Sequence, residues 1–309
     1  MNKKVSAIVI NWNGMAFIKE CLESLQKQIY NNIRVIFIDN GSTDDSVEYS
    51  KQNFPWADLI LFNTNQGFEI PNNIAIQKAL ADGADYILLL NNDLVLAPNA
   101  VSELVAAGER DPTVGALGPV QVRYDNPAKV ISAGGYYDWM RGMVVQNEDL
   151  PSLNNEVDFL SGAALMVKKV VLEQVGMLDE DYYFYGEDVD FCKRIKQNGY
   201  KLLCVASSIV RHHVGGSRSD SSFHIYHITR SRFILMKRYA PLYNWLYFLP
   251  FFIKNSICGE VWWYLRNNRN NEAKAMMKAV MDSFSNHIRL EFLQPLTMSR
   301  SHKDGKQSS

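Results

Sequence analysis

Short apolar runs alternate with longer amphipathic stretches through the first third of the chain. The apolar runs are rich in β-branched and aliphatic residues, which is typical of buried strands, and the stretches between them have helical spacing. This alternation predicts an α/β fold with a mainly parallel sheet and right-handed crossovers. The expected strands are residues 5–10, 34–38, 59–62 and 87–90, and the expected helices are residues 16–28, a segment capped by Ser42 or Thr43, residues 72–81 and residues 98–109.

The pattern is less regular in the middle of the chain. Residues 114–160 contain Gly134, Gly135 and several aromatic residues, and we expect short hairpins or loops there over one end of the sheet. Regular patterning then returns. The expected elements are a strand that ends near residue 167, a helix over 169–175, a helix over 187–199, a strand over 201–206 followed by a loop, and a helix over 224–239.

Charge divides the chain into two parts. Residues 1–217 hold 18 Lys and Arg against 27 Asp and Glu, whereas residues 218–309 hold 14 against 6. The overall net charge of −1 argues against nucleic acid as the main partner, but the basic second part indicates an anionic partner such as a membrane surface. We expect an α/β domain over 1–217, a helical, basic and aromatic region over 218–298, and a disordered tail over 299–309.

The sequence predicts a cytoplasmic location. The four cysteines have no C-x-x-C spacing and are typical of buried thiols in a reducing compartment. The start of the chain lacks the long apolar segment of a secretory signal. The longest apolar stretch, residues 242–253, is interrupted by Asn244 and Pro250 and is shorter than the roughly 20 residues that a membrane-spanning helix needs.

Aromatic and basic residues are mixed in the C-terminal part. Residues 224–239 have the pattern of a basic amphipathic helix, and residues 242–253 and 261–265 combine aromatic side chains with nearby Lys and Arg. This mixture fits a helix lying on anionic lipid. It also fits a helical subdomain packed on the main domain, or a dimer interface.

Polar residues follow three of the expected strands. Asn11 and Asn13 follow the first, Asp39 the second and Asp93 the fourth. In open α/β sheets ligands bind beyond the carboxyl ends of the strands, so these side chains predict a site for a polar ligand. Asp93 suits a hard cation such as Mg²⁺ or Mn²⁺ that carries phosphates. Neither G-x-G-x-x-G after the first strand nor G-x-x-x-x-G-K-[ST] occurs, which argues against a dinucleotide fold and a P-loop.

Three stretches carry candidate chemistry. An acceptor carboxylate at Asp39 could bind a nucleobase N–H or ribose hydroxyls, although an Asx-turn would also explain much of this loop. Glu187 and Asp188 follow a segment rich in aromatic residues, where a carboxylate could deprotonate a sugar hydroxyl; the helix dipole alone would also favour acids there. His212 and His213 could reach a metal or a phosphate, with His213 preferred.

Taken in order, these motifs resemble the inverting glycosyltransferases of family 2, especially the bacterial branch that includes rhamnosyltransferases. The resemblance covers about residues 5–217, roughly two-thirds of the chain. The matching pieces are Ile8-Val-Ile-Asn-Trp-Asn-Gly14, Asp39-Asn-Gly-Ser-Thr-Asp44, Asn65-Gln-Gly-Phe68 with Asn72-Asn73, Leu89-Leu-Asn-Asn-Asp93, Phe159-Leu-Ser-Gly-Ala-Ala164, Gly186-Glu-Asp-Val-Asp190, and His213 before Gly216-Ser217.

The resemblance implies a GT-A fold and a role for each matched position. Asp188 corresponds to the catalytic base, next to Glu187, and Asp93 would coordinate a divalent metal on the donor diphosphate, with His213 completing that site in some members. Asp39 resembles the residue that holds the nucleobase. The other positions expected to bind the nucleotide sugar are Asn11, Asn13, Asp44, Gly67, Asn73 and Asn92.

The implied reaction is inverting transfer of a sugar from a nucleotide-diphospho-sugar to a hydroxyl of a glycan or lipid-linked acceptor. L-Rhamnose from dTDP-rhamnose, used in bacterial surface polysaccharide synthesis, is the first choice by resemblance. Another hexosyl or galactofuranosyl transferase, or a non-catalytic sugar-nucleotide or glycan-binding protein, is the alternative. Glu69-Ile-Pro71 stands where relatives often have Ala-Gly-Gly, and this departure bears on the donor sugar. A nucleotidyltransferase is disfavoured because the first loop lacks a Gly-rich, Arg-containing sequence.

Overall fold

The structure is a computed structural model that describes residues 3–213 and 221–284. Within these residues, ten strands form one mixed sheet in the order β10-β12-β6-β11-β4-β1-β2-β3, with β5 against β12 and β7 against β6. The strands of this sheet are β1 (Val5–Asn11), β2 (Ile33–Asn40), β3 (Asp58–Phe62), β4 (Tyr86–Asn91), β5 (Leu94–Leu96), β6 (Val114–Arg123), β7 (Val130–Ser132), β10 (Asn155–Val157), β11 (Ala164–Lys168) and β12 (Lys201–His212).

The first half of the sheet is parallel, as predicted. β1 lies between β2 and β4, and β3 lies outside β2. The register sets Asn11 opposite Asp39 and Ile10 opposite Asn91. The carboxyl ends of β1, β2 and β4 therefore meet at one edge of the sheet, which confirms that the polar residues after these strands are neighbours.

β11 makes the sheet mixed. It runs antiparallel to both β4 and β6. Because of this direction, the segment just before β11 starts at the polar edge, where the Asn91 N–H donates to the Ala163 carbonyl at 2.9 Å. Residues 161–163 consequently lie beside the end of β4.

The expectation of loops and short hairpins over 114–160 is wrong for its first part, since β6 is a ten-residue strand. Gly115, Gly118 and Pro119 break the apolar run that would reveal it. Gly118 is needed for packing, because an added Cβ would lie 2.7 Å from Leu160 Cδ2. The expected hairpin exists further on, as β8 (Gly135–Asp138) and β9 (Met143–Gln146).

β12 is also longer than predicted. The sequence pattern stops at residue 206, but the strand continues to His212 after a register shift between Val205 and Ile209. Ala206, Ser207 and Ser208 occupy this irregularity, and the two serines interrupt the apolar pattern. His212 is therefore the last residue of a strand and not part of a loop.

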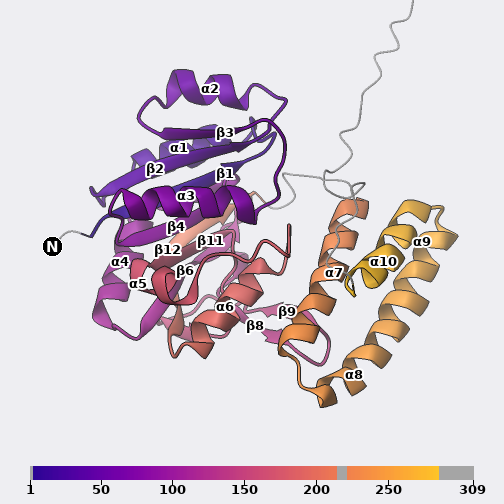
Figure 1. The fold of residues 1–309 in the computed structure, drawn as a ribbon. Coiled ribbons are helices and arrows are strands. Elements are labelled where there is room, and N and C mark those ends of the chain that lie inside the picture. The colour runs from indigo at the N-terminus through magenta and orange to yellow at the C-terminus, as the bar shows by residue number, and fades with distance from the viewer. Residues whose placement is uncertain (1–2, 214–220, 285–309) are drawn as a thin grey trace, which may run out of the picture.

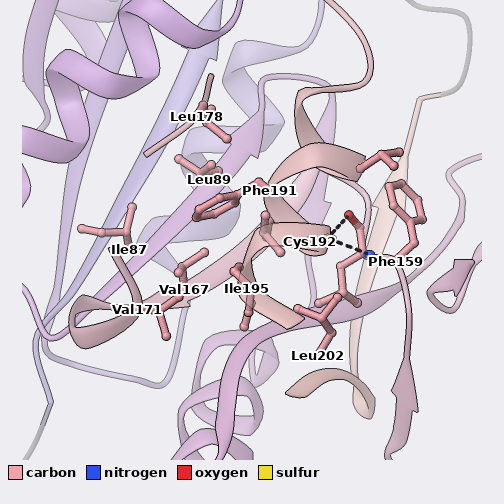
Figure 2. Close-up of a cluster of buried hydrophobic side chains, with 14 of the residues drawn as sticks. Ile87, Leu89, Phe159, Val167, Val171, Leu178, Phe191, Cys192, Ile195 and Leu202 are labelled. Atoms are coloured by element: carbon pink, nitrogen blue, oxygen red, sulfur yellow. Dashed lines mark hydrogen bonds between the residues drawn. The ribbon is translucent and has the colours of Figure 1, made fainter. Parts of the chain in front are cut away.

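Helices cover both faces of the sheet. Alternate residues of β1 point to opposite sides, so Ile8 joins one apolar cluster and Val9 the other. Figure 2 shows the first cluster, in which Phe191 and Ile195 of α6 pack near Leu89 of β4 and Val167 of β11. The helices of this part are α1 (Ile18–Gln26), α2 (Ser46–Asn53), α3 (Glu69–Ala81), α4 (Ala100–Arg110), α5 (Lys169–Val175) and α6 (Glu187–Gln197).

The remaining described residues form a helical group at one side of the α/β part, with the segment from α8 to α9 at the outer edge of the molecule (Figure 1). Phe233 and Met236 of α7 pack against Phe248 and Phe252 of α8. The elements are α7 (Ser221–Tyr239), α8 (Leu242–Phe252), the π-helix η1 (Ile253–Val261), α9 (Trp262–Arg266) and α10 (Asn270–Asp282).

The predicted helix over 224–239 is present as α7, but its expected basic face is partly turned inward. Arg230 is buried and donates to the carbonyls of Asp181 and Tyr182. Arg232 donates to the carbonyls of Arg141 and Gly142. The expected boundary at 217/218 and the expected tail over 299–309 lie outside the described residues. Among the helices that the structure describes, none combines the length and apolarity needed to cross a bilayer.

Candidate active site

The ends of β1 and β2 are joined by a buried hydrogen-bond network. Asn11 Nδ2 donates to Asp39 Oδ1 at 2.9 Å and to Ser42 Oγ at 3.2 Å. Ser42 in turn donates to Asp39 through its hydroxyl at 2.6 Å and its N–H at 2.9 Å. Asp39 is only 2% exposed, so its carboxylate is held rigidly by protein groups at the strand edge. A ligand would have to share these acceptor oxygens.

The expectation that Ser42 or Thr43 caps the following helix is wrong. α2 begins at Ser46, with Asp45 in the cap position. The Ser42 hydroxyl instead serves the strand ends, where it also accepts the Asn13 N–H at 2.8 Å. Local Asx and Ser hydrogen bonds outside a helix resemble a capping signal in the sequence, which explains the error.

The predicted residues Asn13 and Asp44 link the loops after β1 and β2. Asn13 Oδ1 accepts the Thr43 N–H at 2.7 Å, and Asp44 Oδ2 accepts the Met15 N–H at 3.0 Å. Asn13 has φ of 50°, a left-handed conformation that Asn tolerates better than most residues. Both side chains fix the shape of the polar edge.

Asn92 joins the same network from the end of β4. Its Nδ2 donates to Asn11 Oδ1 at 2.6 Å. Gly14 lies against this contact: an added Cβ would be 1.8 Å from Asn92 Nδ2 and 2.3 Å from Asn11 Oδ1. The glycine therefore leaves room for the hydrogen bond that joins the β1 and β4 ends.

Asp93 faces His212 across the end of β12. The Asp93 Oδ2 and His212 Nε2 atoms are 3.4 Å apart. Asp93 Oδ1 and His212 Nδ1 are both buried and have no hydrogen-bond partner among the described residues. An orphaned carboxylate oxygen beside an imidazole fits one side of a divalent-cation site. The described residues contain no group of three or more His, Cys, Asp or Glu able to hold a metal, so phosphate oxygens would have to supply further ligands.

The structure brings the backbone of His213, and not its imidazole, to Asp93. The His213 N–H donates to the Asp93 carbonyl at 3.0 Å. Its ring stacks on Tyr124 with centroids 3.6 Å apart, and its Nε2 lies 3.2 Å from Glu20 Oε2. Sequence reasoning preferred His213, but the imidazole placed next to the Asp93 carboxylate is that of His212.

Asp188 lies in the first turn of α6 and is partly exposed. Its Oδ2 accepts the Gly162 N–H at 3.0 Å, and its Oδ1 accepts the Val189 N–H at 2.9 Å. Gly162 belongs to the segment beside the end of β4, so Asp188 stands at the polar edge with Asn92 and Asp93. Burial raises the pKa of the Asp188 carboxyl, and the two backbone N–H groups partly oppose this.

Two more carboxyl groups lie close by. Glu187 is buried, and its pKa is raised well above the ordinary value by burial and then by the charges of Asp188 and Glu69. Glu69, at the start of α3, is 1% exposed and its pKa is likewise raised by burial. Glu187 Oε2 and Glu69 Oε1 lack hydrogen-bond partners within the described part of the chain. Sequence reasoning gave Glu69 itself no role. The signal that could have indicated it is the sequence Glu69-Ile-Pro71, which stands where relatives often have Ala-Gly-Gly.

The predicted residues Gly67 and Asn73 hold the segment that leads to Glu187. The Phe68 N–H donates to the Tyr183 carbonyl at 2.9 Å, and Gly67 (φ 82°) leaves no room for a Cβ, which would lie 2.7 Å from that carbonyl oxygen. Asn73 donates to the Leu178 carbonyl at 2.9 Å and accepts the Leu178 N–H at 3.1 Å. The start of α3 is thus bound to residues 178–183.

The same segment is held from the other side by α7. Tyr183 and Tyr185 have φ of 67° and 63°, a left-handed conformation that bulky residues adopt only when their surroundings impose it. The Tyr185 hydroxyl is hydrogen-bonded to His224 Nδ1. Arg230 binds the Asp181 and Tyr182 carbonyls. The C-terminal helices therefore shape the entry into the helix that carries Asp188, a contribution that the sequence pattern did not indicate.

Comparison with known proteins gives one family match. The family described as Glycosyl transferase family 2 matches residues 6–176, which is more than half of the chain. An N-acetylglucosaminyl-diphospho-decaprenol L-rhamnosyltransferase of Mycobacterium tuberculosis strain H37Rv is 27% identical over 261 residues, covering 76% of this chain and 85% of the relative. The dTDP-rhamnosyl transferase RfbF of Shigella flexneri is 24% identical over 254 residues, covering 78% and 83%.

Solved structures show the same fold. S. aureus TarS in complex with UDP-GlcNAc has a TM-score of 0.60 at 17% identity, covering 92% of this chain and 81% of that chain. A mannosyltransferase from Pyrobaculum calidifontis, in complex with GDP-Man and Mn²⁺, has a TM-score of 0.58 at 17% identity, covering 93% and 89%. The GT-A fold predicted from the sequence is confirmed.

Proposed function

Because the chain belongs to glycosyltransferase family 2, we propose that it is an inverting enzyme that moves a sugar from a nucleotide-diphospho-sugar to an acceptor hydroxyl. The observation that carries this proposal is the position of Asp188. A carboxylate with a raised pKa is fixed by the Gly162 and Val189 N–H groups at the edge where the ends of β1, β2 and β4 meet. A base placed beside a polar ligand site is what hydroxyl activation requires.

Asp188 takes the proton of the acceptor hydroxyl as its oxygen attacks the anomeric carbon of the donor. The bond from that carbon to the diphosphate oxygen breaks on the opposite face, so one displacement inverts the anomeric configuration. The reaction needs no covalent intermediate and hence no second nucleophilic carboxylate. Glu187 lies buried beside Asp188, and its pKa is raised by this burial and by the Asp188 charge.

Asp93 and His212 are the residues that would hold a divalent cation, Mg²⁺ or Mn²⁺. Such an ion neutralises the charge that develops on the leaving diphosphate. Of the two histidines, His212 is assigned here because its imidazole faces Asp93, while His213 contributes its backbone N–H. The Asn11, Asp39 and Asn92 network would bind the nucleoside end of the donor.

The first-choice donor is dTDP-L-rhamnose, and the first-choice acceptor is a lipid-linked saccharide. Two relatives named as rhamnosyltransferases match about three quarters of the chain, and the name of one specifies a diphospho-decaprenol acceptor. The reaction would then contribute to surface polysaccharide synthesis at the cytoplasmic face of the membrane. A different hexose remains the alternative, since a relative from Haloferax volcanii is named a hexosyltransferase.

The proposal is tested by incubating the full-length protein with single nucleotide sugars, Mg²⁺ or Mn²⁺, and a short-chain lipid-linked N-acetylglucosamine acceptor. We expect release of dTDP from dTDP-rhamnose and a product whose anomeric configuration, read by NMR, is opposite to that of the donor. Binding of a donor should also raise the melting temperature. Retention of the anomeric configuration would refute the mechanism, and absence of binding by any nucleotide sugar would refute the enzymatic role.

A further inference from the structure

The outermost helical segment, from α8 into η1, packs on the rest of the protein through one narrow stripe of buried side chains, with Trp245 and Ile257 partly buried beside it. The buried residues of this segment are Asn244, Phe248, Phe252 and Ser256, spaced four apart. Residues four apart lie on one narrow stripe of a helix. Most of the circumference of the helix therefore faces away from the protein.

The outward surface of α8 and of the first residue of η1 is strongly apolar. No charged residue occurs from Leu242 to Ile253. Leu242 is 86% exposed, Leu246 74% and Tyr243 64%, and Tyr247 and Ile253 are also more than half exposed. A helix that is apolar around most of its circumference is normally buried, and contiguous exposed apolar surface marks an interaction site.

α9 continues the surface with aromatic and cationic side chains in contact. Trp262 and Trp263 are both about half exposed. Arg266 lies over the Trp262 ring, with its guanidinium carbon 5.0 Å from the centroid, and Arg269 lies 5.6 Å from the centroid of Trp263. Trp and Tyr with adjacent Arg are enriched where an apolar interior meets a charged headgroup layer.

The distribution of charge selects one orientation. The described C-terminal residues 221–284 hold nine Lys and Arg against three Asp and Glu, whereas residues 1–217 have an acidic excess. An anionic surface would attract the helical side and repel the α/β side. A second copy of the chain would instead bring two basic helical groups together.

We propose that the face formed by Leu242, Tyr243, Leu246, Tyr247, Ile253, Trp262 and Leu265, here called the docking face, inserts into the interfacial layer of an anionic membrane. The helix lies in the plane of the surface, since its uncharged stretch is too short to span the apolar core, and Arg266 meets the lipid phosphates. Membrane binding through this face does not depend on the transferase reaction.

Cys258 provides a native reporter for the test. It lies in η1 and is exposed, whereas Cys21, Cys192 and Cys204 are buried. A polarity-sensitive thiol fluorophore attached to full-length protein at Cys258 is titrated with vesicles of phosphatidylcholine, alone or mixed with phosphatidylglycerol. We expect a blue shift and sedimentation with the mixed vesicles, both weakened by salt.

Two variants and a matched control give the specificity. Leu246→Glu should weaken partitioning about tenfold or more, because it places a charge where an exposed apolar side chain enters the membrane. Arg266→Gln should weaken binding to the mixed vesicles roughly fivefold and leave the salt-independent part unchanged. Leu153→Glu, which alters an equally exposed leucine of the α/β part, should change nothing.

Other occupants of the face give different results. Vesicle binding that is absent, or unchanged in Leu246→Glu, overturns the proposal. So does a concentration-dependent dimer in light scattering that Leu246→Glu dissolves, which would assign the face to a second copy. A fall in the melting temperature of Leu246→Glu without vesicles would assign it to packing within the chain. Donor binding, measured in parallel, tests the transferase function separately.

Discussion

Replacing Asp188 by Asn tests the assignment of the base most directly. The substitution keeps the size of the side chain but removes the proton acceptor. In the wild type, one carboxylate oxygen accepts the Gly162 N–H and the other accepts the Val189 N–H. An amide has one carbonyl oxygen, so one of these N–H groups will face an NH₂ group instead.

The two consequences differ in size. Loss of a general base slows turnover about 100- to 10,000-fold, which corresponds to roughly 3–5 kcal/mol of transition-state free energy. Loss of one hydrogen bond to a backbone N–H costs about 1–3 kcal/mol of folding stability. For a protein of this size that lowers the melting temperature by only about 2–4 °C per kcal/mol. The variant should therefore be folded and nearly inactive.

Asp190 provides a matched control two residues along the same helix. It is fully buried and contacts Arg194 Nε at 2.7 Å and the Tyr239 hydroxyl at 2.6 Å, so its role is structural. Asp190→Asn weakens these buried charged contacts and should cost about 3 kcal/mol or more in stability. We expect the opposite pattern from that of Asp188→Asn. The melting temperature of Asp190→Asn should fall clearly, and at temperatures below its melting point the variant should keep most of its turnover.

The assay is the steady-state rate of nucleoside diphosphate release with acceptor present, together with the melting temperature and the donor dissociation constant of each variant. The raised pKa of Asp188 adds a pH signature, because the base works only when deprotonated and activity is lost as pH falls through that raised pKa. If folded Asp188→Asn keeps more than about a tenth of wild-type turnover, the base lies elsewhere.

Four further substitutions, of which His213→Ala is a control, test other parts of the site. His212→Ala should weaken metal-dependent donor binding about 10- to 100-fold, whereas His213→Ala should weaken it much less. The donor dissociation constants are measured by calorimetry with and without Mn²⁺, and equal losses in the two variants would reject His212 as the metal ligand. Glu69→Gln should stabilise the fold above neutral pH. The pKa of the buried Glu69 is raised in the folded state, so the wild type loses stability as pH rises beyond the unfolded-state pKa of about 4.3. A difference in melting temperature between variant and wild type that does not shrink at acidic pH would contradict this. Gly14→Ala should displace Asn92 and weaken donor binding without unfolding, and unchanged affinity would show that this contact does not shape the site.

The sequence predicts best those elements whose residues act locally. β1, β2 and β4 are continuous apolar runs, and the register that places Asn11 opposite Asp39 follows from their parallel pairing. β6 was missed because Gly115 and Gly118 leave room for distant residues, Tyr200 and Leu160, and a local sequence window does not contain that information.

The site shows the same limit. Asp188 was predicted as the base because acidic residues at the start of a helix form a compact motif. The preference for His213 over His212 could not be checked from the sequence, since adjacent strand residues point to opposite sides and the end of β12 lies beyond an irregular register. The role of Arg230 was hidden for a similar reason. A basic residue on a helix usually faces water, but here Arg230 donates hydrogen bonds to backbone carbonyls of a segment about 50 residues earlier in the chain.

Residues 181–186 are held in place by contacts with α7, and this has a consequence for the order in which parts of the protein fold. During synthesis the helix that bears Asp188 leaves the ribosome well before Arg230, so its strained approach through Tyr183 and Tyr185 has no support at that stage. The α/β part can collapse early, but its catalytic geometry is completed only when the late helices arrive. The two parts are therefore not interchangeable modules, and grafting the α/β part onto another C-terminal region would require re-creating the contacts of Arg230.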